Sequence, residues 1–313
     1  MQCHEYRKIR SSPSMAINVC PVTSEFVAEV GDVDLSQPLD PSDLVDIKKA
    51  FWKYAVLIFP DQQLTQDQHL EFAMNFGPLE MSISAFRKDD PQRMRLELAN
   101  VSNLGADDKP LPEDSRVRLM QKANQLWHTD SSFKHVPALT SLLYARSIPP
   151  VGGLTEFADA RAAYDALSGE MKNRLEGLVA EHWYLKSRAK AGFTNFTDVE
   201  RENLPPVPQV MVRAGPESGR KSLYVASHIT RVFGMPDEEG LALAEELIDH
   251  ATQRQFVHSH RWRVHDLVMW DDRCTLHRGG DFDGQRWSRD MHRATVSDVA
   301  NTCEQFGISV AAE

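Results

Sequence analysis

The sequence predicts a mainly β protein with flanking α-helices and a jelly-roll or barrel core. Short apolar segments separated by turn residues follow one another through the C-terminal part of the chain, as in antiparallel β proteins. The regular alternation of strand and helix that a parallel sheet requires does not occur, and the sequence has neither a GxGxxG nor a P-loop motif. Apolar residues make up 42% of the 313 residues, which is enough for a large core.

The N-terminal half favours helices with buried strands between them. Thr65 and Gln68 form a capping-box pattern at the start of one helix, and Gly77 ends it. Charged residues and prolines are dense around 81–124, a composition typical of a mobile lid insertion. The elements expected in this half are a helix over 40–54, a strand over 55–59, a helix over 65–77 and a strand over 94–103.

The C-terminal half predicts mostly strands. Pro149 to Gly153 makes a turn between two of them, and a helix that begins at Pro236 has an acidic first turn, which suits the helix dipole. Strands are expected over 139–147, 154–159, 221–227, 255–262, 266–270, 275–280 and 291–298. Helices are expected over 159–167, 168–182 and 236–252.

Charge and cysteine content exclude several classes of partner. The chain has 35 basic and 45 acidic residues, a net charge of −10, whereas nucleic acids and anionic membranes need a basic surface. The apolar run at 55–59 is too short to span a bilayer. The four cysteines are scattered without a CxxC pair, which favours free thiols in a reducing compartment. We therefore expect a cytoplasmic protein, with residues 1–15 as a disordered leader and Met15 as an alternative start.

The stretch QLWHTDSSF, residues 125–133, places a histidine and an aspartate one residue apart. On an extended strand His128 and Asp130 point to the same side, whereas on a helix they diverge. Among the histidines that could join them, His277 has the most suitable setting, at a strand end before two glycines. Two histidines and one carboxylate on one face of an octahedral metal are the ligand set of non-haem Fe(II) oxygenases.

Other interpretations of these side chains stay open at this point. A lone HxD pair occurs often by chance and can be purely structural. His258 and His260 could also share a strand face, but no carboxylate lies beside them. Cys274 and His277 form half of a zinc-binding pattern that no second pair completes.

The segment SRDMHRATV, residues 288–296, predicts two anion sites. In a strand Arg289 and Arg293 share a face, with their Cα atoms about 13 Å apart at ~3.3 Å per residue. Two guanidinium groups on a buried face need anions, and arginine binds carboxylates through paired hydrogen bonds. The alternative is a surface strand with salt bridges to Asp290 and nearby acids.

A resemblance to a known family rests on three segments that follow in order: NQLWHTDSSF, GGLTEFADARAAYDAL, and DLVMWDDRCTLHRGGDFD with the later RDMHRAT. Together they resemble the taurine/2,4-dichlorophenoxyacetate dioxygenase family, and within it the 2,4-dichlorophenoxyacetate branch. The similarity extends from about 30 to 295. It implies a double-stranded β-helix, a cupin-like jelly roll, forming a single domain over 16–313. It also implies a mononuclear Fe(II), 2-oxoglutarate as co-substrate, and O2.

The resemblance further implies roles for particular residues. By motif, the iron ligands would be His128, Asp130 and His277, the cofactor-binding residues Thr155, Trp270 and Arg289, and the substrate-binding residues Arg293 and Asn124. Thr155 and Arg289 would bind the distal carboxylate of 2-oxoglutarate, with Trp270 beside it. Arg293 would bind the acid group of a small anionic substrate.

The implied reaction is hydroxylation of the carbon next to the acid group of an aryloxyalkanoate, giving a phenol, glyoxylate, succinate and CO2. One alternative is the same chemistry on a sulfonate, an alkyl sulfate or another small organic acid. A different class of alternative is a non-catalytic cupin-like protein that binds metal and anion. By analogy with the family, the protein could be a homodimer or a higher homo-oligomer.

The sequence departs from the family pattern at three places. Twelve positions separate His277 from Arg289, one more than in close relatives, which makes Arg286 an alternative for either arginine role. Ala85 stands where the herbicide enzyme carries a pocket lysine, for which Arg87 or Lys88 could substitute. Arg231 stands where a second pocket histidine is expected. These differences concern the substrate more than the chemistry.

Overall fold

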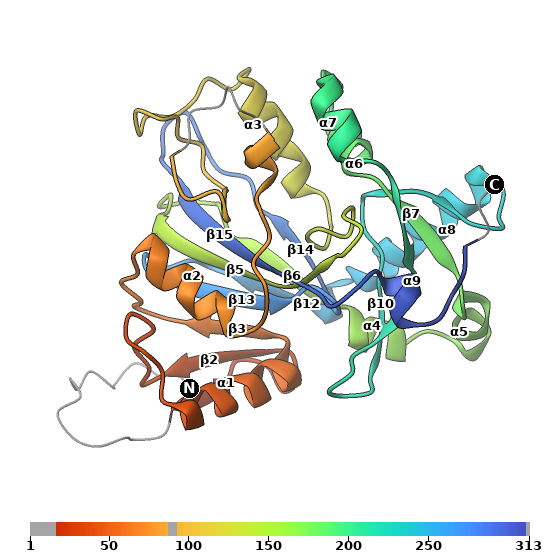
Figure 1. Cartoon of the computed structure of the whole chain (residues 1–313), viewed down its shortest axis with the longest axis horizontal. Coiled ribbons are helices and arrows are strands. Elements are labelled where there is room, and N and C mark those ends of the chain that lie inside the picture. Colours follow the sequence, from red (N-terminus) through yellow and green to blue (C-terminus); the bar gives the residue numbers. More distant parts are fainter. Residues whose placement is uncertain (1–16, 87–92, 311–313) are drawn as a thin grey trace.

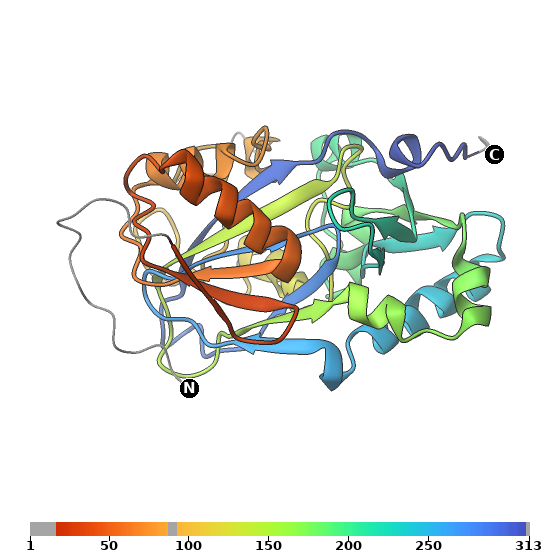
Figure 2. The same ribbon diagram turned by 90° about the horizontal axis from the view of Figure 1, so that it is seen from below.

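The computed structural model describes residues 17–86 and 93–310 (Figure 1). The leader expected over 1–15, including Met15, lies outside the described residues, and so do Arg87 and Lys88. Two layers of β-sheet form the centre of the molecule, with helices on the outside and a third group of strands and helices beside them (Figures 1 and 2). The predicted mainly β class with flanking helices is confirmed.

The larger layer is a seven-stranded sheet in the order β1-β2-β3-β13-β5-β15-β4. Its strands are β1 (Asn18–Pro21), β2 (Val27–Gly31), β3 (Val56–Phe59), β4 (Leu98–Asn100), β5 (Ala138–Ser147), β13 (Leu267–Asp271) and β15 (Asp290–Ser297). Neighbouring strands are antiparallel, except that β2 and β3 are parallel. This sheet supplies the rigid floor of the site.

Two helices cover the outer face of this sheet. In α1 (Pro41–Tyr54) and α2 (Gln66–Met74), apolar side chains such as Phe51 and Leu70 pack on a core cluster that includes Leu142 of β5. The Asp40 side chain caps α1, and the predicted capping box of Thr65 and Gln68 is present at α2. The burial of one face of each helix against the sheet fixes both of them.

The smaller layer is a three-stranded antiparallel sheet in the order β12-β6-β14. Its strands are β6 (Thr155–Asp159), β12 (Val257–His260) and β14 (Thr275–Gly279). A fully buried cluster that includes Phe157, Trp270 and Met291 lies between the two sheets. Face-to-face packing of two antiparallel sheets over such a core is the jelly-roll arrangement, here without a closed barrel among the described strands.

A third group of elements stands beside the two sheets and covers one end of them (Figure 1). Its strands are β7 (Val179–His182), β8 (Val207–Val210), β9 (Val212–Ala214), β10 (Lys221–Leu223) and β11 (Ile229–Val232). Its helices are α4 (Ala160–Asp165), α5 (Gly169–Leu175), α6 (Tyr184–Lys190), α7 (Asp198–Asn203), α8 (Asp237–Ala251) and α9 (Thr302–Gln305). Within the described residues no helix is long and apolar enough to cross a bilayer.

Several predicted elements differ from the structure. The helix predicted over 168–182 is wrong at its end, because α5 stops at Leu175 and Val179–His182 forms β7 between β8 and β11. Gly177, at φ 74°, reverses the chain there. The strand predicted over 94–103 is only three residues long as β4, and the strand predicted over 221–227 ends at Leu223.

The segment expected as a lid has some structure of its own. Its described part contains η1 (Ile83–Phe86), β4, α3 (Arg116–Gln121) and η2 (Lys122–Gln125). β4 joins the edge of the large sheet by pairing with β15, and η2 leads directly into the HxD motif. The segment therefore lies at the mouth of the site that the motif belongs to.

Candidate metal centre and its two cavities

A short β-bridge brings the two predicted histidines together. His128 donates its backbone N–H to the carbonyl of His277 at 3.0 Å, and His277 donates to the carbonyl of His128 at 2.7 Å. His277 is fixed in turn because β14 pairs with β6. The HxD motif is extended only at this bridge, since the chain turns at Asp130 and Ser131 has a positive φ of 52°. The strand suggested for 125–133 is therefore not formed, yet the two side chains still meet.

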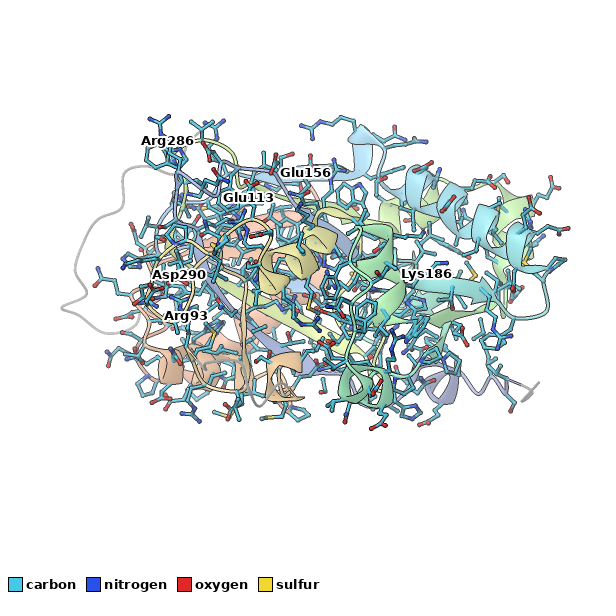
Figure 3. All side chains as sticks on the ribbon, turned by 90° about the horizontal axis from the view of Figure 1, so that it is seen from above. Arg93, Glu113, Glu156, Lys186, Arg286 and Asp290 are labelled. Atoms are coloured by element: carbon cyan, nitrogen blue, oxygen red, sulfur yellow. The ribbon has the colours of Figure 1, made fainter. Side chains whose placement is uncertain are left out.

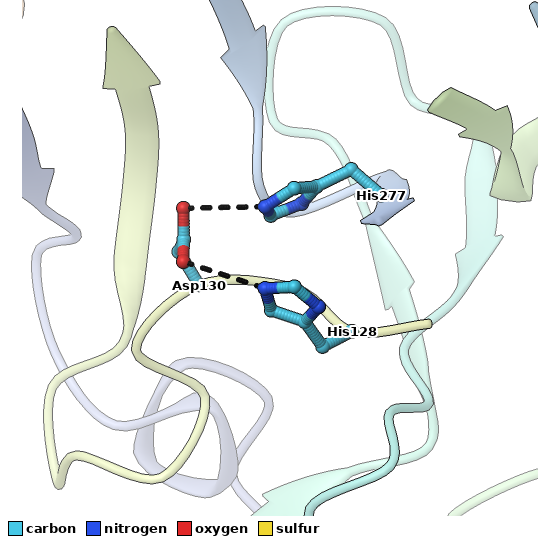
Figure 4. Close-up of side chains that lie close together, drawn as sticks. All are labelled: His128, Asp130 and His277. Atoms are coloured by element: carbon cyan, nitrogen blue, oxygen red, sulfur yellow. Dashed lines mark ion pairs between the residues drawn. The ribbon is translucent and has the colours of Figure 1, made fainter. Parts of the chain in front are cut away.

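The three predicted metal ligands converge on one point (Figure 4). His277 Nε2 lies 3.6 Å from Asp130 Oδ2, and His128 Nε2 lies 3.9 Å from Asp130 Oδ1. One ligand atom of each residue lies within 4.8 Å of the others, and all three side chains are buried. Within the residues that the structure describes, no other group of three His, Cys, Asp or Glu side chains meets this condition.

The electrostatic environment gives each of the three side chains the protonation state of a metal ligand. Burial lowers the pKa of His128 to about 4 and that of His277 well below its ordinary value, so both imidazoles are neutral at pH 7. Burial would raise the pKa of Asp130, but Arg293 and the two histidines lower it to about 2. His128 donates through Nδ1 to the carbonyl of Leu126 at 2.7 Å, which leaves the Nε2 lone pair for a metal. This donor set fits Fe(II).

A buried aspartate that the sequence reasoning did not single out holds Asp130 in place. Asp272 accepts a hydrogen bond from the backbone N–H of Asp130 at 3.0 Å and another from Trp270 Nε1 at 2.9 Å. Ser141 donates its hydroxyl to Asp130 Oδ2 at 2.8 Å. In the sequence, Asp272 reads only as a turn residue, and no signal there shows that its side chain reaches back to the HxD motif.

The larger of two cavities, about 710 Å³, opens beside His277. All three residues predicted to bind 2-oxoglutarate line it, namely Thr155, Trp270 and Arg289. The Thr155 hydroxyl accepts a hydrogen bond from Trp262 Nε1 at 2.9 Å, so its own proton is free to be donated into the cavity. Trp270 lies against His277, with ring centroids 4.7 Å apart.

Arg289 is a buried cation without a counter-charge among the residues that the structure describes. Its side chain reaches only the carbonyl of Gly153, from Nε at 3.3 Å, and no carboxylate of the described chain forms an ion pair with it. Only 8% of the residue is exposed, and burial lowers its pKa to about 10, so the group stays charged at pH 7. A buried cation is costly unless an anion meets it. Arg289 in this cavity therefore fits the distal carboxylate of 2-oxoglutarate.

The smaller cavity, about 280 Å³, lies on the Asp130 side of the triad. Arg293 lines both cavities and donates from a terminal guanidinium nitrogen to Asp130 Oδ1, while its Nε is buried without a partner in the described chain. Asn124 also lines both cavities. One part of the wall is apolar and consists of Ile83, Met94, Val101, Leu104, Leu111, Val117, Met120, Phe133 and Tyr184, whereas the rest carries polar and charged side chains such as Glu80, Glu97 and Lys134.

Most of the residues considered as substitutes in the sequence do not reach the site. Arg286 is exposed at the periphery (Figure 3), stacks on Trp287 and lines neither cavity. Arg231 lies over Phe233 beside Glu181, away from both cavities, and Ala85 also lines neither. His260 binds Asp266 at 3.1 Å rather than joining His258 in a metal site.

Two further buried residues border the smaller cavity. One is His228, which was among the histidines that could have joined the HxD pair, and the other is Arg188, which no sequence pattern singled out. His228 packs its ring against His128, with centroids 5.9 Å apart, and neither ring nitrogen has a partner among the described residues. Burial lowers its pKa well below the ordinary value. Arg188 of α6 is also buried there. Both come from parts of the chain far from the HxD motif.

The chain is similar to several known dioxygenases. A model of the taurine catabolism dioxygenase TauD, TfdA family matches residues 18–295. The chain is 44% identical over 286 residues to the alpha-ketoglutarate-dependent 2,4-dichlorophenoxyacetate dioxygenase of Cupriavidus pinatubonensis, covering 91% of this chain and 99% of that one. It is 37% identical to the (S)-phenoxypropionate/alpha-ketoglutarate-dioxygenase of Sphingobium herbicidovorans, covering 92% and 98% of the two chains.

A solved structure resembles the chain as well. The crystal structure of AAD-2 in complex with Mn(II) and N-oxalylglycine superposes with a TM-score of 0.84, at 46% sequence identity, and covers 92% of this chain and 99% of that one. That protein was thus crystallised with a divalent metal.

Proposed function

The chain belongs to the taurine catabolism dioxygenase TauD, TfdA family, and from that premise we propose that it hydroxylates the carbon next to the acid group of an aryloxyalkanoate. It is a non-haem iron dioxygenase that uses Fe(II), 2-oxoglutarate and O2. For an aryloxyacetate the product is a hemiacetal, which falls apart into a phenol and glyoxylate. One oxygen atom of O2 enters this product, and the other enters the succinate formed with CO2 from 2-oxoglutarate.

The observation that carries the proposal is the position of the triad between two cavities of different chemistry. His128, Asp130 and His277 would hold the iron, which supplies O2 activation and C–H oxidation when bound. With three protein ligands, the iron would keep further coordination positions for exchangeable ligands. The bridge between His128 and His277 holds the backbones of the two residues next to each other.

In the larger cavity, the chain would bind and orient 2-oxoglutarate. Arg289 would donate two hydrogen bonds to the distal carboxylate, with the Thr155 hydroxyl donating a third. Trp270 forms a wall between this carboxylate site and His277. The residues thus fix the length of dicarboxylate that reaches the triad.

In the smaller cavity, Arg293 and Asn124 would bind the acid group of the substrate. The apolar wall would take the aryl ring and exclude water from the reacting carbon. Because Arg293 also touches Asp130, an acid group bound to it lies close to the triad, and the adjacent carbon lies closer than the ring. This geometry favours attack next to the acid group over attack on the ring.

Much of this wall comes from the segment 81–124, and we propose that the segment acts as a lid over the substrate. Arg93 ties it to Asp290 of β15 at 3.3 Å (Figure 3) and pairs with Asp108 inside the segment at 2.5 Å. The buried Cys274 and Cys303 are free thiols, which supports the proposed cytoplasmic location.

The experiment that tests this function is succinate release with Fe(II), ascorbate and 2-oxoglutarate across aryloxyacetates, arylpropionates and sulfonates. We expect succinate and a matching amount of phenol from 2,4-dichlorophenoxyacetate. His277→Ala should abolish both products, whereas the matched control His135→Ala, at an exposed histidine beside Glu304, should leave them unchanged. Sulfite from taurine without phenol from the herbicide would instead establish the sulfonate alternative. The absence of succinate with every substrate would favour a non-catalytic binder.

A further inference from the structure

Arg188 is a buried arginine in the wall of the smaller cavity. It belongs to α6, is 7% exposed, and stacks its guanidinium on Tyr184, 4.5 Å from the ring centroid. One terminal nitrogen donates to the carbonyl of Met120 at 3.1 Å and to Asn124 Oδ1 at 2.9 Å. Its Nε is buried and has no partner among the described residues.

The other charged side chains of this wall have counter-charges, whereas Arg188 has none in the described chain. Lys134 pairs with Glu80 at 2.5 Å, and Arg93 and Arg293 pair with Asp290 and Asp130. No carboxylate of the described residues lies within ion-pair distance of Arg188. A guanidinium buried in this way is costly, so its presence needs an explanation beyond packing.

The contact with Asn124 determines which way the amide of that residue faces. A guanidinium carries donors only, so the atom of Asn124 that meets Arg188 must be the carbonyl oxygen, and the NH2 group must face elsewhere. Asn124 Nδ2 has no partner among the described residues, and Asn124 lines both cavities. Its two N–H groups are therefore available to a ligand.

We propose that Arg188 is a positioning residue that presents the Asn124 amide as a donor to the acid group of the substrate. The inference rests on the proposed function, which places an acid group in this cavity. Without Arg188 the amide could rotate by 180° and present its oxygen to the acid, where two acceptors repel each other. Arg188 also leaves a net positive charge behind the amide, which favours an anion there over a neutral group.

A purely structural role for Arg188 predicts different behaviour. The bond to the Met120 carbonyl, at the end of α3, also ties α6 to the segment before the HxD motif. If that tie were the whole role, loss of Arg188 would weaken every ligand of the cavity alike. It would also do so whether or not Asn124 was present.

The test is a double-mutant cycle on Arg188→Met and Asn124→Ala, in enzyme loaded with Mn(II) and N-oxalylglycine. The dissociation constant of 2,4-dichlorophenoxyacetate is measured by calorimetry, with 2,4-dichloroanisole as a probe of similar shape that lacks the acid group. Arg188→Lys keeps a charge and a donor, and should recover part of the affinity. Arg116→Met is the matched control, because Arg116 also ties α3 to the neighbouring α7, through Glu200, but lines neither cavity.

We expect Arg188→Met to weaken binding of the acid by about tenfold, but by less than about twofold when Asn124→Ala is already present. Binding of the anisole to Arg188→Met, and binding of both ligands to the control Arg116→Met, should stay near the wild-type values. An equal loss for acid and anisole, or the same loss in both backgrounds, would overturn the inference while leaving the proposed function intact. If wild-type enzyme releases no succinate with any acid, the proposed function itself fails.

Discussion

Replacing Arg289 with methionine should raise the stability of the metal-free protein and at the same time destroy its affinity for 2-oxoglutarate. Burial lowers the Arg289 pKa to about 10, which at ~1.4 kcal/mol per pH unit corresponds to a cost on the order of 3 kcal/mol for the charged group. The hydrogen bond to the Gly153 carbonyl returns only about 1 kcal/mol. Methionine fits the space without the charge, so we expect a net gain of about 1–2 kcal/mol in the free energy of unfolding.

The effect on the cofactor has the opposite sign. Two charge-assisted hydrogen bonds to a carboxylate contribute about 1.5–3 kcal/mol each, so their loss should weaken 2-oxoglutarate binding by at least about a hundredfold. Chemical denaturation measures the first quantity, and calorimetry of the Mn(II)-loaded enzyme measures the second. In the control Arg273→Met, a buried arginine loses its ion pairs with Asp271 and Glu217, so this variant should lose about 3–5 kcal/mol of stability. If Arg289→Met behaved like this control and bound 2-oxoglutarate normally, our account of Arg289 would be refuted.

Three further predictions concern the surroundings of the site. Asp272→Ala removes the acceptor for the Asp130 N–H and should weaken Fe(II) binding about 10–100-fold in a metal titration. Asp272→Asn keeps an acceptor there, so its Fe(II) affinity should stay within about threefold of the wild-type value. Equal affinity in the wild type and both variants would contradict this prediction. Gly153 has a φ of 67°, and the Cβ of Gly153→Ala would lie 2.8 Å from Pro149 Cγ. This variant should lose about 1–3 kcal/mol of unfolding free energy and raise the KM for 2-oxoglutarate, because Arg289 is adjacent. In the control Gly177→Ala, at φ 74° with nothing within 4 Å of the new Cβ, only stability should change. Burial would raise the pKa of Asp290, but the nearby His292 and Arg93 lower it to about 2. The carboxylate therefore contributes stability above about pH 4 that is lost as the pH falls toward 2. Asp290→Asn should flatten the unfolding free energy over this range, and an unchanged pH profile would contradict the assignment.

The triad could be predicted because the residue types and spacings that indicate it lie within short sequence segments. His128 and Asp130 differ by two positions, and His277 stands before two glycines at a strand end, so residue type and spacing favour the triad, and the family resemblance selects it even though the strand at 125–133 does not form. The position of Arg289 and Arg293 beside the triad could be anticipated for a related reason, since two arginines in an apolar strand need anions, whereas their roles in binding stay predictions. Neither argument depends on the three-dimensional neighbourhood.

The residues that could not be predicted act through long-range contacts. Asp272, Arg188 and His228 reach the site from a turn, a helix and a loop before β11, and nothing in their immediate sequence differs from an ordinary polar position. The same limit partly explains β7. Gly177 marks the end of the helix before it, but only pairing with β8 and β11 makes Val179–His182 a strand.

The central claim is that the three residues of the triad bind ferrous iron together with 2-oxoglutarate, and visible spectroscopy tests it most directly. Anaerobic addition of Fe(II) and 2-oxoglutarate to the wild-type protein should produce a weak charge-transfer band, which should persist in His135→Ala and vanish in His277→Ala. A wild-type protein that shows no band, or a His277→Ala protein that keeps it at full strength, would contradict the account.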